Sequence, residues 1–128
     1  MPQWQMPKQM KSEKNPLVPS SALVINCNDI ANITQQELDK CAEFSYKNVD
    51  SKLNNVYQQL LASTPEPRRR KLTSAQRVWM KFRQAACDYE RTLSRAGNVA
   101  PTLYYGCLSK ITDQRAQELQ EYLQEGDK

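Results

Sequence analysis

The chain has 128 residues, a length that accommodates one domain with a modest hydrophobic core. Its composition, 39% hydrophobic and 25% charged, is that of a globular protein rather than a disordered or fibrous one. It contains no histidine, so most hydrolase and metal-site mechanisms would need substitutes for the commonest general base and metal ligand. We therefore expect a protein without catalytic residues, metal or cofactor.

The positive charge is distributed unevenly along the chain. The net charge of +4 favours anionic partners but is too small to indicate a nucleic-acid-binding protein. Between Arg68 and Arg95 lie nine basic and two acidic residues, a local charge of +7. This segment is either a solvated face offset by acids on neighbouring helices, which we favour, or a surface for phosphates or an acidic partner.

Four cysteines without a CxxC motif or a histidine indicate two disulfides rather than a zinc site. Disulfides are typical of an oxidising compartment. The chain contains no apolar run of a length that would span a membrane, and residues 1–16 lack the apolar segment of a signal peptide. We therefore expect a periplasmic or secreted protein without a membrane span, from which a signal peptide has been removed.

The first predicted elements are a tail and a long helix. Residues 1–26 carry four prolines among polar residues, which predicts an extended or mobile tail. The sequence TQQE, from Thr34 to Glu37, matches a capping box and predicts the start of a helix. Apolar residues at helical spacing extend this helix to about Ala62.

A second helix is predicted after the sequence STPEP at 63–67. Thr64 can cap it, and Pro65 fits a first turn, where a missing N–H costs nothing. Gly97 and Asn98 tolerate a left-handed conformation, so the helix is expected to end near Ala96. Its predicted buried stripe is Leu72, Ala75, Trp79, Phe82, Ala86 and Leu93.

A third helix is predicted from Pro101 to about Gly126. Its predicted buried face is Tyr104, Leu108, Ile111, Arg115, Leu119 and Tyr122. Short connections make consecutive helices antiparallel. The predicted fold is therefore all-α, an up-down-up three-helix protein with two disulfides and an extended N-terminal tail. Its predicted parts are the tail, residues 1–26, and a helical domain, residues 27–128.

Three motifs along the helical domain, in this order and spacing, resemble the lysozyme inhibitor LprI N-terminal-like family of small exported bacterial proteins. The motifs are D..LN..Y (Asp50, Leu53, Asn54, Tyr57), Q..W...R...C (Gln76, Trp79, Arg83, Cys87) and C....T..R...L (Cys107, Thr112, Arg115, Leu119). The resemblance covers roughly residues 27–123. It implies a helical, disulfide-bonded, extracytoplasmic protein, and one member of the family is described as inhibiting lysozyme.

Two features bear on how far this resemblance extends. Asn26 precedes Cys27, where a lipoprotein signal would have a small residue, so we expect Cys27 to form a disulfide rather than to carry a lipid. Familiar animal lysozymes are strongly basic, and a chain of charge +4 would meet long-range repulsion from them. A local acidic patch could still allow the chain to inhibit such an enzyme.

We expect the disulfides to pair Cys27 with Cys41 and Cys87 with Cys107. Each bond joins neighbours in the sequence, and each closes a loop of about 15 to 21 residues, worth about 3 kcal/mol in the chain-entropy model. Cys41 lies in the second turn of the first predicted helix. Cys107 lies near the start of the third, beside the end of the second.

Arg83 is the most unusual residue of the second predicted helix, because it lies one turn from both Trp79 and Cys87. A buried guanidinium needs a carboxylate, a carbonyl or an aromatic face, and Asp50 and Glu90 are the candidate carboxylates. Arg115 poses the same problem on the third helix. We expect these arginines to belong to a structural polar layer or, less favoured, a binding cleft, formed by Asp50, Asn54, Tyr57, Gln76, Trp79, Arg83, Glu90 and Arg115.

The predicted function is that of a non-enzymatic binding protein, either a lysozyme inhibitor whose partner is a lysozyme-type hydrolase or an envelope-associated module. The alternative is a basic surface module that binds anionic envelope polymer or nucleic acid through Arg68, Arg69, Arg70 and Lys71. Four consecutive helical residues point in directions about 100° apart, so they cannot all face one flat partner. No aromatic residues interleave with this run to stack on bases, so we do not expect nucleic acid as a partner.

Overall fold

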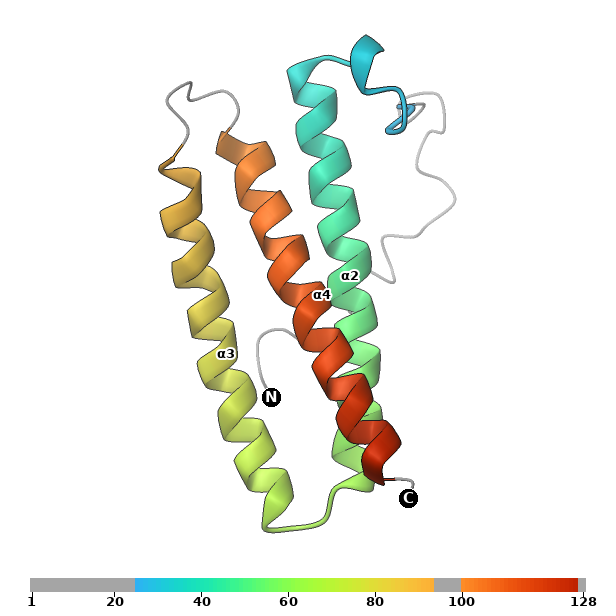
Figure 1. Cartoon of the computed structure of the whole chain (residues 1–128), viewed down its shortest axis with the longest axis vertical. Helices are drawn as coiled ribbons and strands as arrows, with labels where there is room; N and C mark the ends of the chain where they lie inside the picture. The colour runs from blue at the N-terminus through green and yellow to red at the C-terminus, as the bar shows by residue number, and fades with distance from the viewer. Residues whose placement is uncertain (1–24, 94–99, 127–128) are drawn as a thin grey trace, which may run out of the picture.

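The computed structural model describes residues 25–93 and 100–126. A single-turn helix, η3 (Ile30–Asn32), precedes three long helices: α2 (Gln35–Ser63), α3 (Arg68–Arg91) and α4 (Ala100–Gly126). Helices α2 and α4 run in the same direction and α3 runs opposite to both (Figure 1). This arrangement confirms the predicted all-α, up-down-up fold with two disulfides. The predicted tail lies almost wholly outside the described residues.

The start of α2 follows the predicted capping box. The Thr34 hydroxyl accepts the Glu37 backbone N–H at 3.1 Å, and the Glu37 carboxylate accepts the Thr34 backbone N–H at 2.9 Å. Two backbone donors that the first turn would otherwise leave unpaired are thereby satisfied.

The boundary between α2 and α3 differs from the prediction. Thr64 does not cap α3 but ends α2, where its hydroxyl donates to the Leu60 carbonyl at 2.6 Å. That carbonyl belongs to the last turn of α2, where no later N–H of the helix is available to donate to it. The hydroxyl supplies a donor instead. Helix α3 begins only after Pro67 and ends at Arg91. The predicted terminators Gly97 and Asn98 lie outside the described residues.

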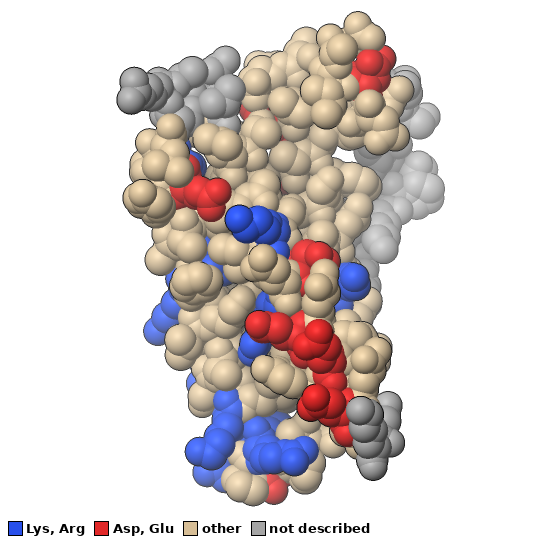
Figure 2. Space-filling view, in the orientation of Figure 1, with Lys and Arg blue, Asp and Glu red and all other residues tan. Residues whose placement is uncertain are grey.

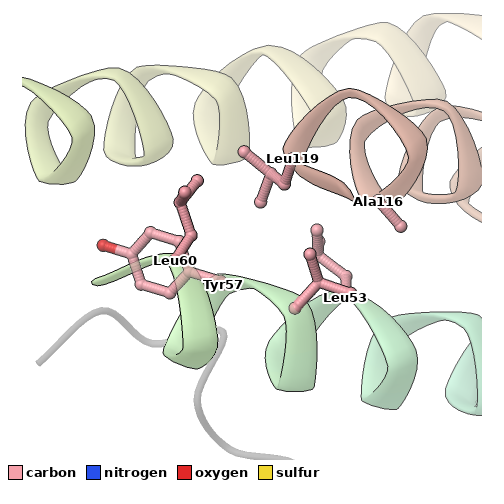
Figure 3. Close-up of a cluster of buried hydrophobic side chains, with 6 residues drawn as sticks. Leu53, Tyr57, Leu60, Ala116 and Leu119 are labelled. Atoms are coloured by element: carbon pink, nitrogen blue, oxygen red, sulfur yellow. The ribbon is translucent and has the colours of Figure 1, made fainter. Parts of the chain in front are cut away.

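The apolar core lies between α2 and α4, towards the end of the bundle that holds the α2–α3 turn (Figures 1 and 3). Its buried side chains are Leu53, Val56, Tyr57, Leu60, Ala116 and Leu119. Helix α3 contributes Leu72, Trp79 and Met80, which are only partly buried against this cluster. The core is therefore built mainly by two helices, and the third covers one side of it.

The buried side of α3 matches the predicted stripe only in part: Leu72 and Trp79 pack against the core, but other members of the stripe do not. Its buried residues are Gln76, Arg83 and Cys87. The predicted core residues Phe82 and Leu93 are each 58% exposed, and Ala75 is exposed as well. Compared with the prediction, α3 is rotated about its own axis. Cys87 and Arg83 are bonded to other helices, and these bonds turn the side of α3 that carries both residues towards the interior.

The two disulfides join the pairs that the sequence predicts. Cys87 and Cys107 connect α3 to α4 with their Cα atoms 5.5 Å apart, and both are buried beside Leu108. Cys27 and Cys41 connect the segment before η3 to α2, with a Cα separation of 5.7 Å. Cys27 itself is exposed. One bond is therefore part of the core, and the other attaches a surface segment.

The two disulfides are expected to differ in their contribution to stability. Their loops are of similar length, so each should contribute about 3 kcal/mol through the unfolded chain. Replacing both Cys87 and Cys107 by Ala should cost more than replacing Cys27 and Cys41, because both cysteines of the first pair are buried whereas only Cys41 of the second pair is. Urea denaturation of the two double variants measures this difference. Equal losses of unfolding free energy would contradict the role of Cys87 and Cys107 in the core.

Candidate functional site

Arg83 makes a buried contact that joins all three long helices. Its Nη1 atom donates to Asp50 Oδ1 of α2 at 3.0 Å and to Thr112 Oγ1 of α4 at 3.1 Å. Arg83 is 8% exposed and Asp50 is 7% exposed. Charge-assisted hydrogen bonds are stronger than neutral ones, and water cannot readily replace either partner at this depth. The sequence left Asp50 and Glu90 as alternatives, and the structure places Asp50 on the guanidinium.

Aromatic rings complete the surroundings of the Arg83 guanidinium. Its central carbon lies 4.8 Å from the centre of the Trp79 ring and 5.6 Å from that of the Tyr46 ring. A cation near an aromatic face is attracted by the negative charge of the ring's π system. Arg83 therefore has a carboxylate, a hydroxyl and two aromatic rings as partners.

Arg115 forms a second polar contact, between α3 and α4. Its Nε atom donates to Gln76 Oε1 at 3.0 Å, and its Nη1 atom donates to Glu118 Oε1 at 3.0 Å. Its guanidinium carbon lies 6.0 Å from the centre of the Trp79 ring. Trp79 is thus within reach of both arginines, and the two polar contacts form one continuous layer.

The other predicted members of the polar layer differ in whether they are hydrogen-bonded to another helix. Asn54 and Tyr57 are buried on α2, and the Tyr57 hydroxyl lies 3.5 Å from Thr73 Oγ1 of α3. Asn54 Oδ1 and Gln76 Nε2 are buried acceptor and donor atoms without a hydrogen bond among the described residues. Glu90, the other candidate partner, does not pair with Arg83.

Sequence reasoning missed three residues of this layer: Tyr46, Thr112 and Glu118. Thr112 belongs to the C....T..R...L motif and lies three residues before Arg115, a spacing that places both side chains on the same face of the helix. The motif could therefore have identified Thr112. Tyr46 lies one turn before Asp50 on α2, but its spacing alone does not distinguish a partner of Arg83 from an ordinary core residue. Glu118 lies three residues after Arg115, a spacing at which helical side chains meet.

Burial controls the ionisation of the groups around Arg83. Burial raises the pKa of Asp50 above its ordinary value, and the charge and hydrogen bond of Arg83 act in the opposite direction. Burial is also the main cause that raises the pKa of Tyr46 from 10.0 to about 12. Tyr46 is therefore uncharged at neutral pH, and the Arg83–Asp50 ion pair has a neutral phenol beside it.

The polar layer joins α2, α3 and α4 through side-chain hydrogen bonds. No group of three or more Asp, Glu or Cys residues that could hold a metal occurs in residues 25–93 and 100–126. A cleft of about 420 Å³ lies at the end of the bundle with the α2–α3 turn, and no residue of the layer lines it. Leu60, Leu72 and Tyr122 form its apolar wall, with Arg68 and Glu125 also lining it.

Figure 2 shows a cluster of Lys and Arg side chains at the end of the bundle that holds the α2–α3 turn and a row of Asp and Glu side chains beside it, with further charges of both signs elsewhere on this face. Arg68, Arg69, Arg70 and Lys71 are all exposed at the first turn of α3. Two of these charges have local partners: Arg69 donates to the Thr64 carbonyl at 3.2 Å, and Arg70 lies 3.8 Å from Glu66. We call the acidic residues along the C-terminal half of α4 the acidic stripe; they are Asp113, Glu118, Glu121 and Glu125.

The first prediction for the polar layer concerns Arg83→Ala. This substitution leaves the Asp50 carboxylate buried without its cation, so we expect it to lower the free energy of unfolding by about 2 to 4 kcal/mol. The double variant Arg83→Met, Asp50→Leu removes both charges and should lose less than Arg83→Ala alone. Urea denaturation measures both. An Arg83→Ala protein as stable as the wild type would contradict a structural role for this pair.

The second prediction concerns alkaline unfolding. The pKa of Tyr46 is higher in the folded chain than its ordinary value of 10.0, so its contribution to stability is present below pH 10 and lost as the pH rises to about 12. Tyr46→Phe should therefore lose less stability over this interval than the wild type, with little change at neutral pH. Denaturation curves at both ends of the interval measure the effect, and identical alkaline losses would contradict it.

Comparisons with known proteins agree with this architecture. The family described as Lysozyme inhibitor LprI matches residues 27–119, a range that includes both disulfides and the whole polar layer. A relative in Rhizobium meliloti (strain 1021), Uncharacterized protein R02472, is 26% identical over 85% of this chain and 96% of its own length. No solved structure matches the chain. The family match covers most of the described helices, and the chain belongs to the LprI lysozyme inhibitor family.

Proposed function

We propose that this protein is a non-enzymatic inhibitor that binds a lysozyme-type hydrolase. The observation that carries the proposal is the family match, which spans η3, α2, α3 and most of α4 rather than one short motif. The arrangement of the buried polar groups supports it. Arg83 and Arg115 are bonded to side chains of their own chain, and the interior therefore acts as a scaffold for an external binding surface.

The proposed site of action is outside the cytoplasm. Two disulfides connect the four cysteines, and such bonds persist in oxidising compartments. A hydrolase of the cell wall or of a host secretion is encountered in the same compartments. Within the described part of the chain, no helix combines the length and apolarity that crossing a bilayer requires.

The acidic stripe on α4 is the surface that best fits a basic hydrolase. The chain as a whole has a charge of +4, which would repel a basic enzyme at long range. The stripe nevertheless presents several carboxylates along one helix (Figure 2), and only its end at Glu125 shares the cleft near the α2–α3 turn with Arg68, at the start of α3. Opposite charges facing each other speed association and favour one orientation of the partner.

Neutralising the acidic stripe tests this proposal. The triple variant Glu118→Gln, Glu121→Gln, Glu125→Gln removes three charges, and the amide oxygen introduced at position 118 could still accept a hydrogen bond from Arg115. In a muramidase assay with a basic animal-type lysozyme, we expect the wild type to inhibit. The triple variant should bind at least about tenfold more weakly, a loss of about 1.4 kcal/mol.

The matched control changes Arg68, Arg69, Arg70 and Lys71 together to Gln, and we expect it to inhibit as well as the wild type. Absence of inhibition by the wild-type protein would contradict the proposed function. A large loss in the control variant, with a flatter dependence on salt, would instead favour a basic surface that binds anionic polymers.

A further inference from the structure

Helix α3 presents a row of apolar side chains on the face that points away from the bundle. Val78 and Tyr89 are each 66% exposed, and Phe82 is 58% exposed. Ala75, one turn before Val78, and Ala85, between Phe82 and Tyr89, are exposed as well. Figure 1 shows α3 at the edge of the bundle. We call these five residues the α3 stripe.

The spacing of the α3 stripe is that of a helix that packs against another helix. Its members lie at positions 75, 78, 82, 85 and 89, so their separations alternate between three and four residues. This alternation is the a and d pattern of a coiled coil. Within residues 25–93 and 100–126, the buried residues of α3 are Gln76, Arg83 and Cys87, and none of them belongs to this stripe.

The residues of the α3 stripe are complementary in size when two copies pair antiparallel. In such a pair, each a position meets a d position of the opposite helix. With the two-fold axis between positions 83 and 84, Phe82 packs against Ala85 of the second copy, and Val78 packs beside Tyr89 of the second copy. The larger side chain thus meets the smaller one in each layer, as close packing requires.

The charges beside the α3 stripe are complementary in the same arrangement. Lys81 and Asp88 are seven residues apart and lie on the same flank of the stripe. Antiparallel pairing places Lys81 of each copy beside Asp88 of the other, whereas parallel pairing does not bring these two charges together. Asp88 accepts hydrogen bonds from Arg91 at 2.8 Å and Gln84 at 3.1 Å, and its side chain remains 46% exposed.

We propose that the α3 stripe binds a second copy of this chain and forms an antiparallel two-fold dimer. A two-fold contact requires a self-complementary surface, and the pairing of sizes and of opposite charges provides one. The stripe extends over about 21 Å of helix. This is short for a standard interface of about 1,200 to 2,000 Å², so the dimer should form reversibly at micromolar concentrations.

The dimer does not depend on the function proposed above. None of the residues of the α3 stripe belongs to the acidic stripe on α4. Failure to inhibit lysozyme would therefore not bear on the dimer, and absence of a dimer would leave inhibition unaffected.

Sedimentation velocity of the full chain across the micromolar range tests the dimer. We expect the wild type to change from monomer to dimer, and Phe82→Glu to lower the association constant at least about tenfold. Phe44→Glu is the matched control, because Phe44 is 63% exposed on α2 and should leave association unchanged. Circular dichroism and thermal melting establish that both variants fold.

Charge exchange tests the antiparallel geometry. Lys81→Glu alone and Asp88→Lys alone each place like charges together and should weaken association, whereas the double variant should restore it. A wild type that stays monomeric throughout, equal losses in Phe82→Glu and Phe44→Glu, or a double variant that is not restored would each overturn the proposal. A chain that dimerises only after removal of residues 1–24 would show that this segment, not a second copy, occupies the stripe, and this too would overturn it.

Discussion

The hydrogen bonds of Arg83 to Asp50 and Thr112 are the constraint on which the arrangement of the helices depends. A guanidinium this deep in the protein cannot exchange its partners for water without a large penalty, so the helices must keep these three side chains together. Asp50 fixes α2, Thr112 fixes α4, and Arg83 fixes the rotation of α3 between them. The Cys87–Cys107 bond lies one turn further along α3 and holds the same side of the helix inwards.

The apolar core and the polar layer contribute different things to the fold. Burial of Leu53, Leu60 and Leu119 supplies a driving force proportional to area, but apolar contacts tolerate small slides and rotations of one helix on another. Hydrogen bonds tolerate much less, because a buried donor or acceptor that loses its partner costs about 1 to 3 kcal/mol. We infer that the Arg83 and Arg115 contacts select one rotation and one register from the several that the core would accept.

Local sequence signals predict most of the fold. The rotation of α3, by contrast, depends on contacts with other helices that the sequence pattern of α3 does not reveal. The capping box at Thr34 and the two disulfide pairings follow from spacing along the chain. The rotation of α3 was wrong in the prediction because its apolar residues cover a wide arc, and periodicity indicates only the middle of that arc. The spacing of apolar residues also cannot predict that Gln76 is buried and Phe82 exposed. That outcome depends on residues of other helices: Arg115, which bonds Gln76, and Asp50, which bonds Arg83.

The wide apolar arc explains why a polar residue at position 83 matters to the surface as well as to the interior. With a leucine in place of Arg83, α3 would carry apolar side chains on two neighbouring faces, the one that packs and the one that holds Val78 and Phe82, and the Cys87–Cys107 bond would have to distinguish them without the ion pair. A single buried charge with its partner on α2 removes this ambiguity, because only one rotation brings Arg83 to Asp50. The apolar face that remains outside is therefore a consequence of the buried ion pair together with the Cys87–Cys107 bond. Any surface that the protein presents on α3 is set by a contact inside the bundle.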